Sequence, residues 1–221
     1  EVLAMVMQIY QSFGLKHLKL VINSIGDAES RKEYNEALVK HFEPVIDDFC
    51  SDCQSRLHTN PMRILDCKVD RDKKAIKTAP KITDYLNDES KAYYEAVKQY
   101  LDDLNIPYVE DSNLVRGLDY YTHTAFELMM DNPNYDGAIT TLCGGGRYNG
   151  LLQLLDGPNQ TGIGFALSIE RLLLALEEEN IDIVENETLD LFIVTMGEAA
   201  NHFAVKLLND CRKNGISADK D

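Results

Sequence analysis

A succession of strand-like segments joined by short connections limits the folds that this chain can adopt. These segments are rich in β-branched and aromatic residues, and they cover residues 108–110, 114–130, 137–143 and 161–166. Short runs of Asp, Asn, Ser and Pro separate the first three. Because consecutive strands with short connections pair in opposite directions, we predict an antiparallel sheet.

Helical patterns precede and interrupt this sheet. Apolar residues of 1–13 share one helical face up to Gly14, residues 18–22 form a short strand, and Asp27 is placed to cap a helix that ends before Pro44. Residues 45–105 are charged, lack glycine entirely and carry helical periodicity in pieces. We predict an α+β fold of the class in which helices flank an antiparallel sheet and a helical insertion divides the sheet domain.

A second domain is expected at the C-terminal end. A leucine-rich helix from Ile169 to Glu178 is followed by an acidic linker, a strand from Leu189 to Thr195 and a helix from Glu198 to Lys213. This is the opening of a β-α-β unit. The predicted boundaries are 1–44 and 106–178 for the two parts of the sheet domain, 45–105 for the insertion, 179–188 for the linker and 189–221 for the start of the α/β domain.

Charge and composition exclude several classes of protein. The formal net charge of −15 argues against broad, non-specific binding of nucleic acid, although a local basic patch remains compatible with it. No apolar run is long enough to span a membrane, and no signal peptide opens the chain. The five scattered cysteines fit a reducing compartment, so we expect a cytoplasmic protein.

One segment combines a cation with phenols. Arg116 is followed closely by Tyr120 and Tyr121 in a stretch rich in strand formers. A guanidinium suits an oxyanion, and a phenol both donates and accepts hydrogen bonds. In a regular strand the two tyrosines would face opposite sides, so one would line a pocket while the other is in the core. A surface salt bridge of Arg116 is the competing interpretation.

Two glycine-containing segments follow. Gly144, Gly145 and Gly146 are expected to interrupt the strands before Arg147, as a hairpin loop or a nucleotide site, with a short helix up to Leu155. Gly162 and Gly164 would leave one strand face flat enough for a planar ring. Ser168 is the predicted N-cap of a helix whose first turn carries Arg171, as a solvated residue or facing an anionic ligand. No standard phosphate-binding loop is present in the sequence.

Three cysteines raise the question of a metal. Cys50 and Cys53 have the C-x2-C spacing of a zinc half-site, but Cys67 stands alone and only His58 offers a fourth ligand. We therefore expect free thiols rather than structural zinc, with Cys50, Cys53 and Cys67 as the candidates to test.

The segment from Arg116 to Tyr121 reads Arg-Gly-Leu-Asp-Tyr-Tyr, which resembles a signature of histidyl-tRNA synthetases. Residues 144–150 resemble the Gly-Gly-Arg-Tyr-x-Gly partner of that signature, and residues 162–172 resemble motif 3 of the class II synthetases. The order and the spacing of the motifs agree, and the similarity extends over essentially all 221 residues.

The resemblance implies a set of roles. Arg116 would be the catalytic cation at the α-phosphate of ATP, and Tyr121, beside Tyr120, would bind the imidazole of L-histidine. Gly145, Gly146 and Arg147 would border the histidine pocket. Gly162, Gly164 and Arg171 would bind ATP, which Mg²⁺ accompanies. The implied partners are L-histidine, ATP and tRNA(His), with a homodimer in the full-length protein, and residues 189–221 would begin the anticodon-binding domain.

Parts of the family pattern are missing. Motif 1, which builds the dimer interface, and motif 2, which grips the α-phosphate and reaches tRNA, do not occur in the sequence. We expect a fragment of a longer protein, and we expect these 221 residues alone to be inactive. The alternative is a catalytically inactive, synthetase-like regulatory subunit of histidine biosynthesis, a class that generally lacks an intact Arg-Gly-Leu-Asp-Tyr-Tyr segment.

Overall fold

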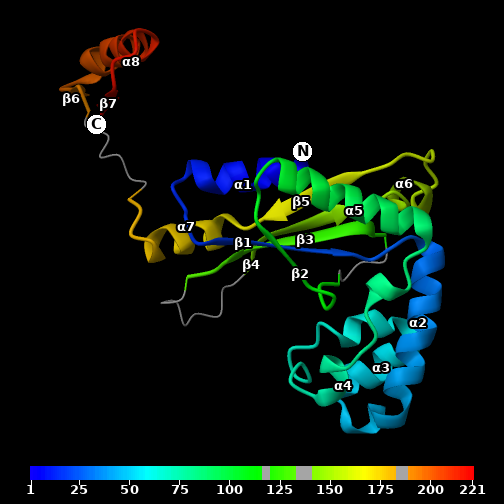
Figure 1. Ribbon diagram of the computed structural model, residues 1–221. Helices are drawn as coiled ribbons and strands as arrows, with labels where there is room; N and C mark the ends of the chain where they lie inside the picture. The colour runs from blue at the N-terminus through cyan, green and yellow to red at the C-terminus, as the bar shows by residue number, and fades with distance from the viewer. Residues whose placement is uncertain (116–119, 133–140, 183–188) are drawn as a thin grey trace. The chain divides into compact units, whose positions relative to one another are not determined.

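The computed structural model describes residues 1–115, 120–132, 141–182 and 189–221. Two compact units are present, Glu1–Ile181 and Asp182–Asp221. The first unit is built on a five-stranded sheet of order β2-β1-β3-β4-β5 (Figure 1). Its strands are β1 (Leu18–Ser24), β2 (Tyr108–Glu110), β3 (Thr122–Met130), β4 (Thr141–Arg147) and β5 (Ile163–Leu167).

The predicted antiparallel sheet is confirmed for four of the five strands. β1, β3, β4 and β5 pair antiparallel, with Ile22 opposite Phe126 and Leu128 opposite Cys143. β2 differs, because it pairs parallel with β1 at the edge of the sheet instead of with the strand that follows it. The reason is its connection, since β2 is reached from β1 through helices, and such crossovers return the chain in the same direction.

Three helices cover one face of the sheet (Figure 1). They are α1 (Val2–Ser12), α5 (Asp88–Asp103) and α7 (Ile169–Glu178). Leu3, Tyr94 and Leu172 of these helices pack in one core cluster with Phe126 and Leu128 of β3. Helix α5, which the sequence assigned to the insertion, therefore packs against the sheet.

A second core cluster lies below the first in Figure 1 and contains the helical segments after β1. They are α2 (Ala28–Phe42), α3 (Ser51–Thr59), α4 (Lys74–Lys77) and the 3-10 helices η1 (Glu43–Asp48), η2 (Pro61–Ile64) and η3 (Ile82–Asp84). We call residues 43–86 the insertion. Asp27 caps α2 as predicted, by accepting a 2.8 Å hydrogen bond from the Ser30 amide. The outer boundaries of the insertion as a domain stay a prediction.

The second unit contains β6 (Leu191–Ile193), α8 (Glu198–Lys213) and β7 (Ala218–Lys220), with the two strands parallel. The strand-helix order is as predicted, and the chain turns at Gly215, where φ is +75°. Phe192 and Phe203 are exposed, whereas Cys211 is buried. One helix packed on two strands within this unit leaves most of their surface uncovered.

Among the described residues, no helix has the length and apolarity needed to cross a membrane.

Candidate functional site

A track of small residues crosses three neighbouring strands of the sheet. Gly146 in β4 lies opposite Ala125 in β3 and opposite Gly164 in β5. A Cβ atom on Gly146 would lie 2.7 Å from the Thr124 carbonyl oxygen, and one on Gly145 would lie 2.3 Å from the Gly164 carbonyl oxygen. These glycines therefore lie within a strand, which corrects the expectation that they interrupt it, and the crowded backbone explains why no side chain fits there.

Three tyrosine rings gather beside this track. The rings of Tyr120 and Tyr121 lie 4.7 Å apart and are tilted by 32°. The ring of Tyr148 lies 6.0 Å and 6.2 Å from them, nearly perpendicular to both. We call Tyr120, Tyr121 and Tyr148 the tyrosine cluster, a geometry that is favourable for aromatic rings.

The expectation that Tyr120 and Tyr121 face opposite sides is wrong. Both precede β3, which begins at Thr122, so strand alternation does not apply to them. The ladder with β4 is also irregular between Thr122 and Ala125, where His123 has a φ of +50°. The rings of Tyr120 and Tyr121 thus lie next to each other instead of on opposite sides of a strand.

Gly162 and Gly164 form a flat floor, as predicted, and a planar ring does lie on it. That ring belongs to Tyr148, because a Cβ on Gly162 would lie 2.4 Å from its Cε2 and one on Gly164 would lie 2.8 Å from its hydroxyl oxygen. Gly162 itself precedes β5, which starts at Ile163. The chain thus covers its own glycine floor with a phenol.

The tyrosine cluster is tied to the rest of the fold through the backbone. The Arg31 Nη1 in α2 donates a 2.7 Å hydrogen bond to the Tyr121 carbonyl oxygen. The Tyr148 amide donates to the Gly162 carbonyl oxygen at 2.8 Å. Each of these hydrogen bonds holds the main chain at a tyrosine, so it fixes the position from which that side chain extends.

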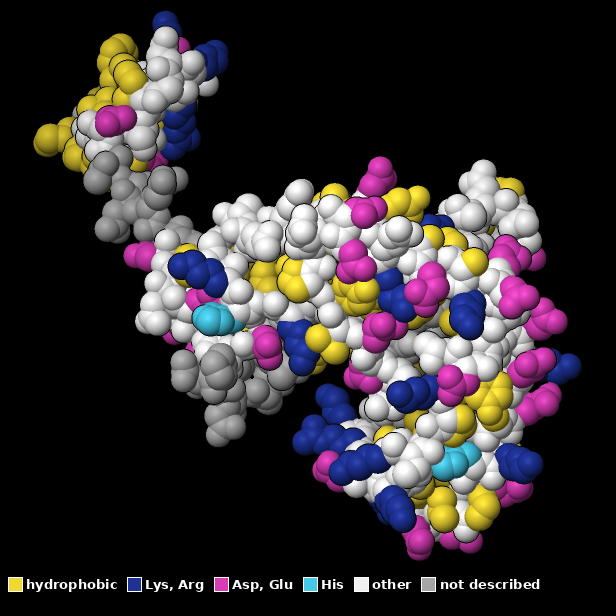
Figure 2. Space-filling view, in the orientation of Figure 1, with side chains coloured by type: hydrophobic (Ala, Val, Ile, Leu, Met, Phe, Trp, Pro, Cys, Tyr) yellow, Lys and Arg dark blue, Asp and Glu magenta, His cyan; other side chains and the backbone are white. Residues whose placement is uncertain are grey.

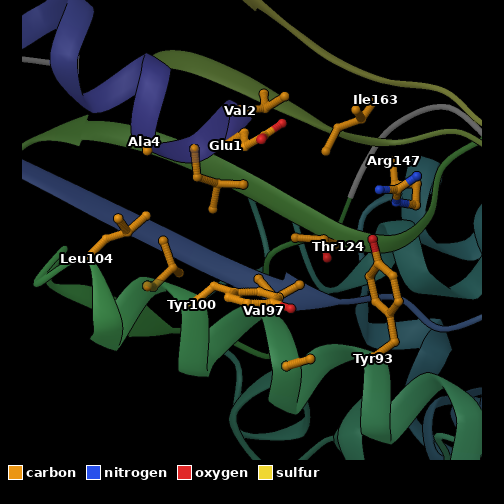
Figure 3. A pocket seen from close by; sticks show the side chains of 13 residues that line it. Glu1, Val2, Ala4, Tyr93, Val97, Tyr100, Leu104, Thr124, Arg147 and Ile163 are labelled. Carbon is orange, nitrogen blue, oxygen red and sulfur yellow. The ribbon is translucent and has the colours of Figure 1, made fainter.

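Arg147 points to the other face of the sheet, into a pocket of about 250 Å³ between α1, α5 and the strands (Figure 3). Its guanidinium carbon lies 5.4 Å from the centroid of the Tyr93 ring. Within the described residues, Arg147 Nε, Thr124 Oγ1 and His123 Nδ1 are buried without a hydrogen-bond partner. Unpaired buried polar atoms cost free energy, so the end of this pocket at Arg147 and Thr124 is suited to a polar group or water.

His123 lies beside this pocket, with its ring 5.0 Å from that of Tyr93. Burial lowers the pKa of the imidazole, and this effect outweighs the nearby Asp27 carboxylate, which raises it. No local sequence pattern marks His123, Thr124 or Tyr93 as site residues. These residues come together only in the folded chain, because Tyr93 lies in α5 and the other two residues lie in β3.

Arg171 lies at the opposite end of the β4–β5 pair from Gly162. Ser168 caps α7 as predicted, accepting a hydrogen bond from the Arg171 amide, and Arg171 Nη1 donates to the Thr141 carbonyl oxygen at 2.6 Å. Thr141 begins β4, whereas the floor glycines lie beside its end at Arg147. The structure therefore joins Tyr120, Tyr121, Gly146, Gly162 and Gly164 but sets Arg171 apart. Arg116 lies outside the described residues.

The three candidate cysteines come together in the insertion. The fourth group beside Cys50, Cys53 and Cys67 is the carboxylate of Asp70. His58, which the sequence offered as the fourth ligand, is exposed and is not part of this group.

Comparison with known proteins gives a consistent family. A family model described as histidyl-tRNA synthetase matches residues 1–172. A curated histidine–tRNA ligase of Staphylococcus aureus strain JH9 is 85% identical over 221 residues, which are 100% of this chain and 53% of that protein. The chain thus spans about half the length of the curated relatives it matches.

Solved structures agree with this result. The crystal structure of apo S. aureus histidyl-tRNA synthetase matches with a TM-score of 0.74 and 79% identity, covering 100% of this chain and 53% of that one. An ATP phosphoribosyltransferase regulatory subunit/histidyl-tRNA synthetase from Bacillus halodurans C matches with a TM-score of 0.53 at 20% identity, covering 100% of this chain and 57% of that one, which supports the fold alone. Since the family model covers most of the chain and the tyrosine cluster lies within that match, the chain belongs to the histidyl-tRNA synthetase family.

Proposed function

We propose that the protein containing this chain is a histidine–tRNA ligase. It would activate L-histidine with ATP to histidyl-adenylate and transfer the histidyl group to the 3′ end of tRNA(His). The observation that carries the proposal is the 85% identity, over the whole chain, to a curated S. aureus protein of that name.

In this proposal the tyrosine cluster binds the imidazole of histidine. The Tyr121 ring is buried against Gly146, and Tyr120 and Tyr148 enclose it. Phenol hydroxyls can donate to one imidazole nitrogen and accept from the other, which suits this ligand. Gly145 and Gly146 contribute their backbone, because no side chain fits above them.

ATP, accompanied by Mg²⁺, is proposed to meet Arg116, Gly162, Gly164 and Arg171. Arg116 would stabilise the charge that develops at the α-phosphate while the histidine carboxylate attacks it. Because the Tyr148 ring covers the glycine floor, a ligand ring reaches Gly162 and Gly164 only when that phenol has moved. The exposed Arg171, bonded to a strand carbonyl, can turn towards an anion.

Histidine-dependent exchange of pyrophosphate into ATP by the full-length protein tests this function. Arg116→Ala should slow adenylate formation by about 10²–10³ without abolishing histidine binding. Arg63→Ala, which removes a half-buried arginine paired with Asp66 in the insertion, is the control and should leave the rate unchanged. Loss of histidine binding at an unchanged activation rate would show that the role of Arg116 is misassigned.

The same assay separates the ligase from the non-catalytic alternative. A full-length protein that binds histidine but shows no exchange would contradict the ligase and support a regulatory subunit. The proposal also includes a homodimer in the cytoplasm. Sedimentation of the full-length protein tests the dimer, and fractionation of the cells that produce it tests the location.

A further inference from the structure

Three thiols and a carboxylate form a compact group inside the insertion. The sulfur atoms of Cys50, Cys53 and Cys67 and a carboxylate oxygen of Asp70 all lie within 4.8 Å of one another. Cys53, Cys67 and Asp70 are buried, and Cys50 is half-buried. A buried carboxylate is costly unless a cation or hydrogen bonds compensate it, so the group needs a physical explanation.

The group consists of two half-sites with the same spacing. Cys50 and Cys53 are separated by two residues at the start of α3, and Cys67 and Asp70 are separated by two residues in the turn that follows η2. Asp70 thus stands where a second C-x2-C pair would have its last cysteine. This spacing places two ligands of each pair on one side of a tight turn, as in structural zinc sites.

Backbone amides point at two of the sulfur atoms. The Asp70 and Val69 amides donate hydrogen bonds to the Cys67 sulfur. The Cys53 amide likewise donates to the Cys50 sulfur. Amide donors directed at sulfur stabilise thiolates, which are the form that binds a metal.

The distances match a tetrahedron around zinc. With Zn–S of about 2.3 Å and Zn–O of about 2.0 Å, tetrahedral angles require S···S of about 3.8 Å and S···O of about 3.5 Å. The Cys50 and Cys67 sulfur atoms are 3.7 Å apart, and the Cys67 sulfur lies 3.6 Å from Asp70 Oδ2. Two edges of the group therefore already have the required length.

Neighbouring groups hold the carboxylate and offset its charge. Asp70 Oδ2 accepts a 3.0 Å hydrogen bond from the Cys50 amide, and Asp70 Oδ1 lies 3.6 Å from Lys73 Nζ. Lys73 is itself held over the Phe49 ring, 4.8 Å from its centroid. Such outer contacts orient metal ligands, and Lys73 and the N-terminus of α3 reduce the excess negative charge of three thiolates and a carboxylate.

We propose that Cys50, Cys53, Cys67 and Asp70 bind one Zn²⁺ in a closed tetrahedral site that holds the insertion together. Four bonds to zinc form, and the thiol protons pass to solvent. Four protein ligands leave no position for substrate, so the site is structural. The sequence alone argued against zinc because His58 was the only fourth ligand in view, and the structure replaces it with Asp70.

The zinc content of the full-length protein, purified under reducing conditions without chelator, tests the proposal. We expect one zinc ion per chain by elemental mass spectrometry. Replacement by Co²⁺ should give sulfur-to-cobalt charge-transfer bands and the visible bands of a tetrahedral site. Reduced wild-type protein with neither zinc nor these bands overturns the proposal.

Two variants and two matched controls assign the ligands. Cys67→Ser should lose nearly all the zinc, and Asp70→Asn should bind zinc at least about ten-fold more weakly. Cys143→Ser, in the buried sheet core, and Asp66→Asn, at a half-exposed aspartate near the site, should keep it. Retention of zinc by Cys67→Ser overturns the site, and wild-type affinity in Asp70→Asn overturns the fourth ligand. Zinc content and zinc affinity are measured without aminoacylation, so these measurements remain decisive if the proposed function fails.

Discussion

At the scale of single residues, Gly146 occupies a position where the structure leaves no room for a side chain. In Gly146→Ala the new methyl group would meet the Thr124 carbonyl oxygen at 2.7 Å and the Tyr121 ring at 3.0 Å. A strand carbonyl cannot move away, so we expect the free energy of unfolding to fall by about 1–3 kcal/mol in urea titrations. Gly150→Ala is the matched control, because no atom lies within 4 Å of its Cβ position. Equal losses in the two variants would contradict this account.

His123 gives a prediction on pH dependence. Burial lowers its pKa below the ordinary 6.5, so the unfolded chain takes up the proton first as the pH falls. The contribution of neutral, buried His123 to the free energy of unfolding is complete above pH 6.5. It is lost as the pH falls from 6.5 through the lowered pKa of the folded state. His123→Gln should remove this part of the acid sensitivity in thermal melts across that range. His202→Gln, an exposed control, should melt with the pH profile of the wild type.

At the scale of elements, two helix starts are joined by their caps. Asn87 caps α5 by accepting a 2.9 Å hydrogen bond from the Ser90 amide, and its Nδ2 donates to the Asp27 carboxylate that caps α2, at 2.8 Å. Asn87→Ala should therefore destabilise both starts, with about 0.5–2 kcal/mol from its own cap alone. Chemical denaturation measures this loss. Asn113→Ala, at an exposed turn asparagine, should cost little, and a similar loss there would refute the link.

Elements with local signals were predictable, whereas pairings between distant segments were not. Periodicity and Asp27 correctly located α1 and the start of α2, and Ser168 located the start of α7. The edge position of β2 depends on which strand it reaches after a long crossover. The common orientation of Tyr120 and Tyr121 depends on where β3 begins, which is after both residues. Asp70 joins the cysteines only after the chain has folded back, so its role had no local signal.

At the scale of the whole molecule, one basic segment stands out in an acidic chain. Residues 68–81 carry six Lys and Arg against two Asp, although the chain has a net charge of −15. Figure 2 shows dark blue side chains gathered on the insertion near α4, while both signs are interspersed over other parts of the first unit. If tRNA is the partner, as proposed, we expect this segment to be the part of these 221 residues that meets its phosphates, because clustered positive charge attracts them.

Reversal of two charges in this segment tests that interaction in the full-length protein. Lys74→Glu combined with Lys81→Glu should weaken tRNA(His) binding. It should also reduce the slope of log affinity against log salt concentration by about 0.7–0.9 for each phosphate that the protein no longer neutralises. The pair Lys32→Glu and Lys91→Glu makes the same charge change at exposed residues of α2 and α5 and should have a smaller effect. An equal loss of affinity in both pairs would mean that only net charge matters. Histidine-dependent pyrophosphate exchange needs no tRNA, so it should stay unchanged in both.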